Sequence, residues 1–159
     1  MKFKITLKVN RKFGDLLPFN YQYEQSAVIY RILAQADTQY SSWLHENGYL
    51  LHERKRFKLF CYSPFIFEKV RPLPEAGCLK IIGERAVWSI SFIPEKSTLE
   101  FIQGIFAHQS FSIGNKKYQV AFDVVGVEAI PMPQLSEEMT FVALSPICVK
   151  LHEDNKTQY

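Results

Sequence analysis

The chain has 159 residues, of which 47% are hydrophobic, enough to bury a core as one domain or as two very small ones. This composition argues against disorder, and no apolar run is long enough to span a membrane. The alternating start, MKFKITLKVN, is typical of a strand and not of an export signal. Cys61, Cys78 and Cys148 form no CxxC pair, which argues against a zinc knuckle or disulfide framework and favours a cytoplasmic protein.

Charge is unevenly distributed along the chain. Residues 1–58 hold ten Lys and Arg against five Asp and Glu, whereas the remainder is mildly acidic. A basic front suits a face that binds an anion such as nucleic acid. Charge alone nevertheless favours the simpler interpretation, a solvated lysine face.

The first half of the chain predicts a strand, two helices and a second strand. Residues 2–9 alternate apolar and polar side chains, and a loop over 10–21 follows. Residues 22–36 carry an apolar stripe at helical spacing, and Asp37 is placed to cap a shorter helix that stops at Gly48. FKLFCY at 57–62 predicts a strand with Lys58, Phe60 and Tyr62 on one face.

The second half predicts five strands, a helix and a linker. After an irregular segment, strands are expected at 78–82 and 86–93, followed by a helix at 95–107. Its apolar stripe is expected to consist of Leu99, Ile102, Ile105 and Phe106.

FSIGNKKYQV predicts a hairpin around Gly114-Asn115, and a change of phase in its second strand predicts a bulge near Val124–Gly126. Residues 131–139 resemble a linker, and 140–151 predict a last strand.

This order of elements predicts an α+β, ferredoxin-like fold. Two split βαβ units (βαββαβ, as in RRM modules) give an antiparallel sheet with helices on one face, here with an extra C-terminal strand. Many RNA-binding modules have this fold, but many metabolic domains also have it, so the fold does not decide the function.

One histidine, His45, and one lysine, Lys58, are candidates for chemistry, whereas His52 is interpreted as an ordinary surface residue of a loop. His45, in the last turn of the second helix, can act as an acid or base, although a surface cap is the commoner role. The spacing of His45 and His52 does not suit a helical metal site, so no metal is expected. Lys58 beside two aromatic residues can contact a phosphate, or it can simply protect an edge strand.

Five blocks in order give the chain a resemblance to a known family. They are LPFNYQY at 17–23, SAVIYRIL at 26–33, SSWLHENGY at 41–49, FKLFCYSPF at 57–65 and TFVALSPICV at 140–149. Together they resemble the CRISPR-associated repeat-RNA endoribonucleases, the Cas-six family of the RAMP superfamily.

The resemblance implies a metal-independent endoribonuclease without a cofactor, whose partner is CRISPR precursor RNA. In that family the ribose 2′-hydroxyl attacks the scissile phosphate and leaves a 2′,3′-cyclic phosphate and a 5′-hydroxyl. Carried over by position, Tyr30, His45 and Lys58 are the expected catalytic residues. Our own inference adds Arg54, Lys55 and Arg56 as contacts to neighbouring phosphates.

The family also implies a second ferredoxin-like domain with a glycine-rich loop, which this sequence does not contain. Residues 1–133 are therefore expected to form one RAMP domain, and 134–159 a linker and the first strand of a second, missing domain. Self-association through that strand is a further expectation. Two alternatives stay open: a non-catalytic RNA-binding subunit of a CRISPR ribonucleoprotein, and an unrelated ferredoxin-like binding domain.

Overall fold

The computed structural model describes residues 1–51, 55–134, 136–143, 151–153 and 156–158. The helices are α1 (Gln22–Ala36), α2 (Thr38–Glu46) and α3 (Glu95–Ala107), with two 3₁₀ turns, η1 (Arg11–Phe13) and η2 (Pro74–Ala76). The strands are β1 (Lys2–Asn10), β2 (Leu16–Pro18), β3 (Tyr49–Leu51), β4 (Lys55–Phe57), β5 (Phe60–Tyr62), β6 (Ile66–Phe67), β7 (Val70–Leu73), β8 (Cys78–Ile81), β9 (Arg85–Phe92), β10 (Ser110–Gly114), β11 (Gln119–Ile130), β12 (Leu151–Glu153) and β13 (Lys156–Gln158).

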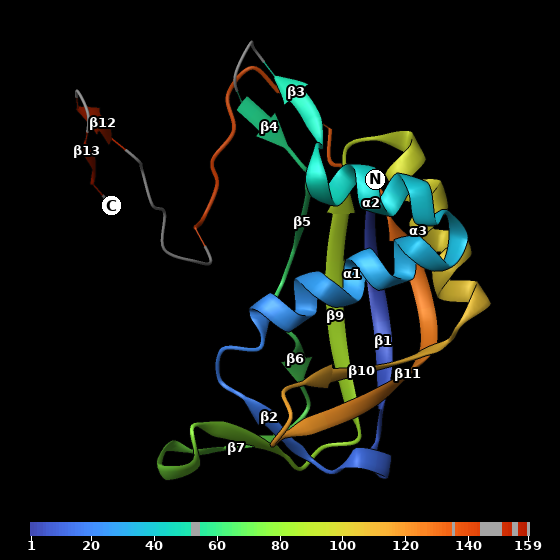
Figure 1. Ribbon diagram of the computed structural model, residues 1–159, viewed down its shortest axis with the longest axis vertical. Helices are drawn as coiled ribbons and strands as arrows, with labels where there is room; N and C mark the ends of the chain where they lie inside the picture. The colour runs from blue at the N-terminus through green and yellow to red at the C-terminus, as the bar shows by residue number, and fades with distance from the viewer. Residues whose placement is uncertain (52–54, 135, 144–150, 154–155, 159) are drawn as a thin grey trace.

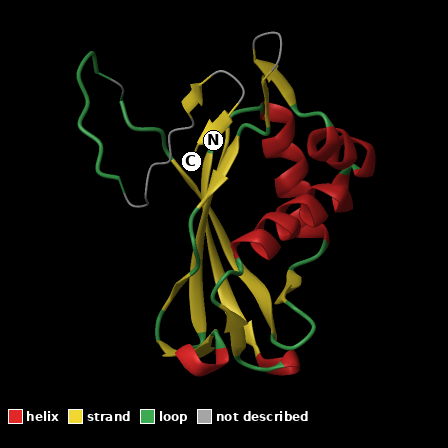
Figure 2. Cartoon of the chain, turned by 60° about the vertical axis from the view of Figure 1, so that its left-hand side comes forward, coloured by secondary structure: helices red, strands yellow, loops and turns green. Residues whose placement is uncertain are grey.

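A large antiparallel sheet organises the molecule, with strand order β10-β11-β1-β9-β5 and β6 also paired to β9. The three α-helices lie together on one face of this sheet (Figures 1 and 2). Helices α1 and α2 connect β1 to β5, and α3 leads from β9 toward β10 and β11. This is the ferredoxin-like arrangement with β10 added at one edge, so the predicted fold class is confirmed. No helix in the described part of the chain is long and apolar enough to cross a membrane.

The pairing of β1 fixes which side chains enter the core. Its alternation is as predicted, with Phe3, Ile5, Leu7 and Val9 buried beneath the helices. Along the β11 side, Thr6 pairs with Gly126 but Leu7 pairs with Val124, so Val125 is an extra residue. The predicted bulge is therefore confirmed.

Helix α3 crosses α1 closely at Gly104. A Cβ atom at this position would collide with the carbonyl oxygen of Ile32 in α1. Glycine weakens a helix by about 1 kcal/mol relative to alanine. Here it is required because it lets the two helix backbones approach each other.

The apolar stripe expected for α3 is wrong at two positions. Leu99 and Phe106 are 54% and 60% exposed, whereas Phe101 is fully buried. Phe101 packs on the sheet against Trp88. The buried face of α3 also includes Gly104 and small polar residues such as Ser97. A prediction based on the spacing of large apolar side chains cannot identify such a face.

Several strands also differ from expectation. The predicted strand at 57–62 is interrupted because Leu59 has a φ of 56°, in the left-handed region, so Lys58 lies in a link between β4 and β5. β8 pairs with β2 and β7 in a separate sheet.

The last predicted strand is only partly tested. Residues 140–143 are not in a strand, and Phe141 and Val142 there are 79% and 80% exposed, so these side chains bury little surface against the described part of the chain. Residues 144–150 lie outside the described residues, and Leu151 begins β12.

Candidate functional site

The C-terminal end of α2 carries His45 and is bounded by two local signals. Asp37 caps the start of the helix, because its carboxylate accepts a hydrogen bond of 2.8 Å from the backbone N–H of Tyr40. At the other end Gly48 has a φ of 69°, and its N–H donates to the carbonyl of Trp43 at 3.1 Å. Both signals were expected from the sequence, and they place the exposed His45 in the last turn.

Tyr30 of α1 lies directly against His45. Their ring centroids are 4.9 Å apart and the rings are nearly perpendicular, at 82°. Phe60 of β5 contacts the same tyrosine edge-on, with centroids 5.8 Å apart. Burial, and secondarily the nearby Tyr62, raises the pKa of Tyr30, so its phenol keeps its proton at neutral pH.

Lys58 reaches the same helix end from the link between β4 and β5. Its ammonium donates hydrogen bonds of 2.5 Å to the carbonyl oxygens of Leu44 and His45. Burial of the ammonium, and secondarily the charge of Arg56, lowers the pKa of Lys58, and the two carbonyls oppose this shift. An ammonium has three donors, so with two directed at carbonyls a third can reach a phosphoryl oxygen.

Gly48 also makes room for Lys58. A Cβ atom on Gly48 would come within 2.7 Å of the carbonyl oxygen of Phe57 and 3.2 Å of Cδ of Lys58. The residue that ends α2 therefore also lets β4 and the lysine stem pass close to the helix end. The sequence indicated the first role of this glycine and not the second, which depends on a tertiary contact.

An aromatic cluster around the buried Tyr40 anchors α2. The hydroxyl of Tyr40 hydrogen-bonds to Ser97 of α3 and, at 2.9 Å, to the hydroxyl of Tyr49 in β3. Trp43 stacks on Tyr40 and contacts Tyr49 edge-on. Burial is the main cause that raises the pKa of Tyr40, so the phenol stays neutral and the cluster keeps its hydrogen bonds. The sequence gives no sign of a role for Tyr49 or Ser97, because only the tertiary fold brings their hydroxyls to that of Tyr40.

Two of the three residues expected to hold neighbouring phosphates, Lys55 and Arg56, lie on β4. Lys55 and Arg56 are exposed, and Arg54 and His52 lie outside the described residues. The guanidinium of Arg56 donates a hydrogen bond of 2.8 Å to the side-chain carbonyl of Asn47, which fixes this cation close to Lys58. Asn47 could not be found from the sequence, because an Asn-Gly pair after a helix indicates a cap but gives no sign of the hydrogen bond to Arg56.

The arrangement brings a phenol, an imidazole and a cation to one junction. The expected proximity of Tyr30, His45 and Lys58 is thus found, although Lys58 meets His45 at its backbone carbonyl and not at its ring. Such a set can move protons and stabilise charge on a phosphate. Within the described residues, no three side chains from His, Cys, Asp or Glu gather as metal ligands, and the metal independence of the reaction stays a prediction.

Comparison with known proteins relates this architecture to one family. Residues 16–123 match the family described as CRISPR-associated protein Cas6, N-terminal. No curated protein sequence matches the chain.

Three solved structures are similar to the chain. One, described as a RAMP protein binding different RNA substrates, has a TM-score of 0.71 at 25% identity, with 99% of this chain and 60% of that chain covered. A Cas6-related protein from Pyrococcus furiosus has a TM-score of 0.74 at 23% identity with the same coverage, and this likeness shows the fold alone. A CRISPR associated protein Cas6 has a TM-score of 0.57 at 25% identity, with 85% of this chain and 50% of that chain covered.

The chain therefore spans about 60% of the length of the first two of these proteins. The family match runs from β2 into β11 and includes the junction at the end of α2. Since these residues make up more than half of the sequence and hold most of the ferredoxin-like core, the chain belongs to the Cas6 family of CRISPR-associated proteins.

Proposed function

We propose that this chain is a metal-independent endoribonuclease, or the catalytic half of one, that cuts the repeats of CRISPR precursor RNA. In the proposed reaction the ribose 2′-hydroxyl loses its proton and attacks the adjacent phosphate. The bond to the 5′-oxygen breaks and that oxygen takes up a proton. The products are a 2′,3′-cyclic phosphate and a 5′-hydroxyl, and no water or metal is consumed.

The three residues at the end of α2 take different roles in this proposal. An imidazole exchanges protons near neutral pH, so His45 removes the proton from the 2′-hydroxyl or supplies one to the leaving oxygen. Tyr30 remains a phenol because its pKa is raised, so it acts as a hydrogen-bond donor that orients the reacting groups or supplies the second proton. Lys58, held on the helix carbonyls, stabilises the charge that builds on the phosphoryl oxygens.

The observation that supports this proposal best is the contact between Tyr30 and His45, with Lys58 fixed on the same turn of α2. The three residues come from α1, α2 and the β4–β5 link, so their convergence is a property of the tertiary fold. Lys55 and Arg56 extend the cationic surface along β4, where they would hold neighbouring phosphates. We further propose that residues 1–133 form the catalytic domain and that 134–159 lead into a second one.

A second candidate is a non-cleaving RNA-binding subunit. The observation that favours it is the bonding of Lys58, because a lysine that donates to two carbonyls at a helix end can be a purely structural cap. In addition, one similar structure is described as a protein that binds different RNA substrates. This candidate requires basic and aromatic surface but no catalytic geometry.

One experiment separates the two candidates. The protein is incubated with repeat RNA from the same genome in the presence of a chelator, alone and with a second domain supplied in trans, and the product ends are identified. Cleavage to a 2′,3′-cyclic phosphate that is lost in His45→Ala supports the nuclease. RNA binding without cleavage in either condition supports the subunit.

A further inference from the structure

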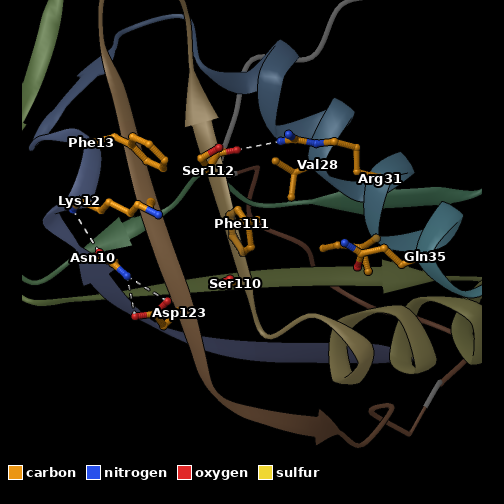
Figure 3. A pocket seen from close by; sticks show the side chains of 12 residues that line it. Asn10, Lys12, Phe13, Val28, Arg31, Gln35, Ser110, Phe111, Ser112 and Asp123 are labelled. Carbon is orange, nitrogen blue, oxygen red and sulfur yellow. Dashed lines mark hydrogen bonds between the residues drawn. The ribbon is translucent and has the colours of Figure 1, made fainter.

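A pocket of about 380 Å³ lies at the edge of the sheet formed by β10, away from His45. We call it the edge pocket, and its walls come from the end of β1, η1, α1, β10 and β11 (Figure 3). Strands β10 and β5 are the two ends of the strand order, so this pocket and the junction at α2 belong to opposite edges of the sheet. It is lined by Asn10, Lys12, Phe13, Val28, Arg31, Ile32, Gln35, Ser110, Phe111, Ser112, Ala121 and Asp123.

Two cations, Lys12 and Arg31, line the edge pocket from different elements. Arg31 extends from α1, and its guanidinium donates a hydrogen bond of 2.8 Å to the backbone carbonyl of Ser112 on the outer strand β10 (Figure 3). This bond fixes the direction of the side chain while using one of its five donors. A guanidinium held in this way is suited to bind a phosphate.

An exposed aromatic ring lies beside these cations. Phe13 of η1 is 52% exposed, and the ammonium of Lys12 lies 5.5 Å from the centroid of its ring. A cation next to an exposed aromatic face is the combination that binds unpaired nucleotides, because the phosphate pairs with the charge and the base stacks on the ring.

The edge pocket also contains a carboxylate, which a site that binds only anions would not have. Asp123 is the one acid among its twelve described lining residues, and its carboxylate accepts hydrogen bonds of 3.2 and 3.3 Å from the amide of Asn10. A carboxylate repels a phosphate, so the phosphate belongs near the two cations. The same carboxylate keeps lone pairs that can accept N–H donors from the edge of a base.

We propose that the edge pocket binds one unpaired nucleotide of the RNA, with its phosphate between Lys12 and Arg31 and its base against Phe13. The volume is at the lower end of small-ligand pockets, which suits a single nucleotide and excludes a duplex. This inference rests on the proposed function and adds a second contact to it. Four spacings of about 4.8 Å, roughly 19 Å in all, separate β5 from β10 across the sheet.

Tyr30 and Arg31 are consecutive in α1, and their side chains leave the helix about 100° apart. One contacts His45 and the other contacts Ser112 on β10. A rigid helix therefore links the two sites, so the nucleotide in the edge pocket would help to determine which phosphate reaches His45.

The test uses abasic scanning of a fluorescently labelled, unstructured fragment of the repeat RNA. Each position in turn lacks its base, and affinity is measured by fluorescence anisotropy for the wild type, Phe13→Leu and Phe13→Tyr. We expect one position at which base removal weakens binding by about fivefold to tenfold in the wild type and in Phe13→Tyr, but not in Phe13→Leu. Phe106→Leu, which changes a ring of similar exposure on α3, is the matched control and should behave like the wild type.

A second arm tests the phosphate contact. Arg31→Gln should flatten the slope of log K against log salt by about 0.7, whereas Arg71→Gln, at an exposed arginine of β7, should leave the slope unchanged. Identical scans for Phe13→Leu and Phe106→Leu would overturn the edge pocket while RNA binding itself stands. Absence of RNA binding in the wild type would instead overturn the proposed function.

Free nucleoside monophosphate is titrated in parallel and followed by NMR shifts of the edge pocket residues. If it binds there while the RNA fragment is indifferent to Phe13→Leu, the pocket serves a free nucleotide, and the RNA assignment is overturned.

Discussion

The side chain of Lys58 contacts the backbone of His45, because the ammonium of Lys58 donates a hydrogen bond to the carbonyl oxygen of His45. The lysine therefore fixes the end of the helix whose last turn presents the imidazole to Tyr30. A cation at a helix C-terminus is also favoured by the helix dipole, typically by about 0.3–1 kcal/mol. Loss of the lysine consequently has two separable effects, one on the position of His45 and one on charge at the phosphate.

His45→Ala should lower the rate of repeat-RNA cleavage by about 10²–10⁴-fold and change the dissociation constant for RNA by less than about threefold. The imidazole moves protons in the transition state and contributes little to binding. Single-turnover cleavage and fluorescence anisotropy provide the two measurements. His108→Ala, at an exposed histidine after α3, is the control and should leave both unchanged. Equal losses of binding and cleavage would identify His45 as a structural cap.

Lys58 should determine how cleavage declines in alkaline solution. Its lowered pKa means that the ammonium loses its proton below the ordinary value of 10.5, so cleavage that needs the cation falls as the pH rises through that lower value. Folding disfavours the charged form, so the free energy of unfolding should rise over the same range, opposite to the activity. In Lys58→Arg the side chain stays charged, and the alkaline decline should disappear from the rate profile. A decline that persists in Lys58→Arg would assign it to another group, such as Tyr30.

Gly48→Ala and Gly77→Ala form a matched pair. Both glycines have a left-handed backbone, with φ of 69° and 63°, but a Cβ at Gly77 meets no atom within 4 Å. Each variant should lose about 1–2 kcal/mol of unfolding free energy from the backbone alone. Gly48→Ala should lose at least about 1 kcal/mol more, and it should also slow cleavage, because its Cβ displaces Phe57 and Lys58. Equal stability and equal activity of the two variants would contradict the contact between Gly48 and Lys58.

Gly104→Ala should destabilise the fold although alanine is the better helix former. The added Cβ collides with the carbonyl of Ile32, so the crossing of α1 and α3 must open, at a net loss of about 2 kcal/mol or more. Urea unfolding measures this loss. Gly126→Ala, where the new Cβ lies 3.7 Å from Cβ of Thr6, is the control and should be close to neutral. A more stable Gly104→Ala would mean that the helices do not cross so closely.

Joint replacement of Lys55 and Arg56 by alanine should flatten the salt dependence of RNA binding. Each phosphate contact on a single strand contributes about 0.7 to the slope of log K against log salt. The same double replacement at Lys69 and Arg71, which are exposed on and beside β7, removes equal charge and should leave the slope unchanged. Equal slopes for the two double variants would place the RNA on another surface.

Local chemistry explains which parts of the site could be predicted from the sequence. Asp37 and Gly48 bound α2 through a side-chain cap and a left-handed glycine, and both depend on neighbours within a few residues. The position of His45 in the last turn follows from them. The bulge at Val125 was equally visible, because it shifts the phase of the apolar residues along one strand.

Tertiary geometry explains the rest. Nothing in the sequence indicates that Leu59 adopts a left-handed backbone, so Lys58 was placed in a strand when it lies in a link. Helix propensity counts Gly104 as unfavourable, whereas the requirement for glycine arises from the carbonyl of Ile32 in another helix. The contact between Tyr30 and His45 needs α1 and α2 to pack together, so only the family resemblance could assign the two residues to one site.

The hairpin of β3 and β4 begins and ends at neighbouring points, since Gly48 before β3 and Phe57 at the end of β4 lie in close contact. Residues 49–56, which we call the β3–β4 segment, are therefore joined to the rest of the protein at two neighbouring points. Tyr49 and Arg56 at its two ends contact α2 and Asn47, so they have to stay. The residues between them can change in length and sequence without moving the end of α2 or the register of β5 on β9. Exchange of the β3–β4 segment between family members would therefore transfer the cationic surface of β4, while the positions of Tyr30 and His45 stay fixed.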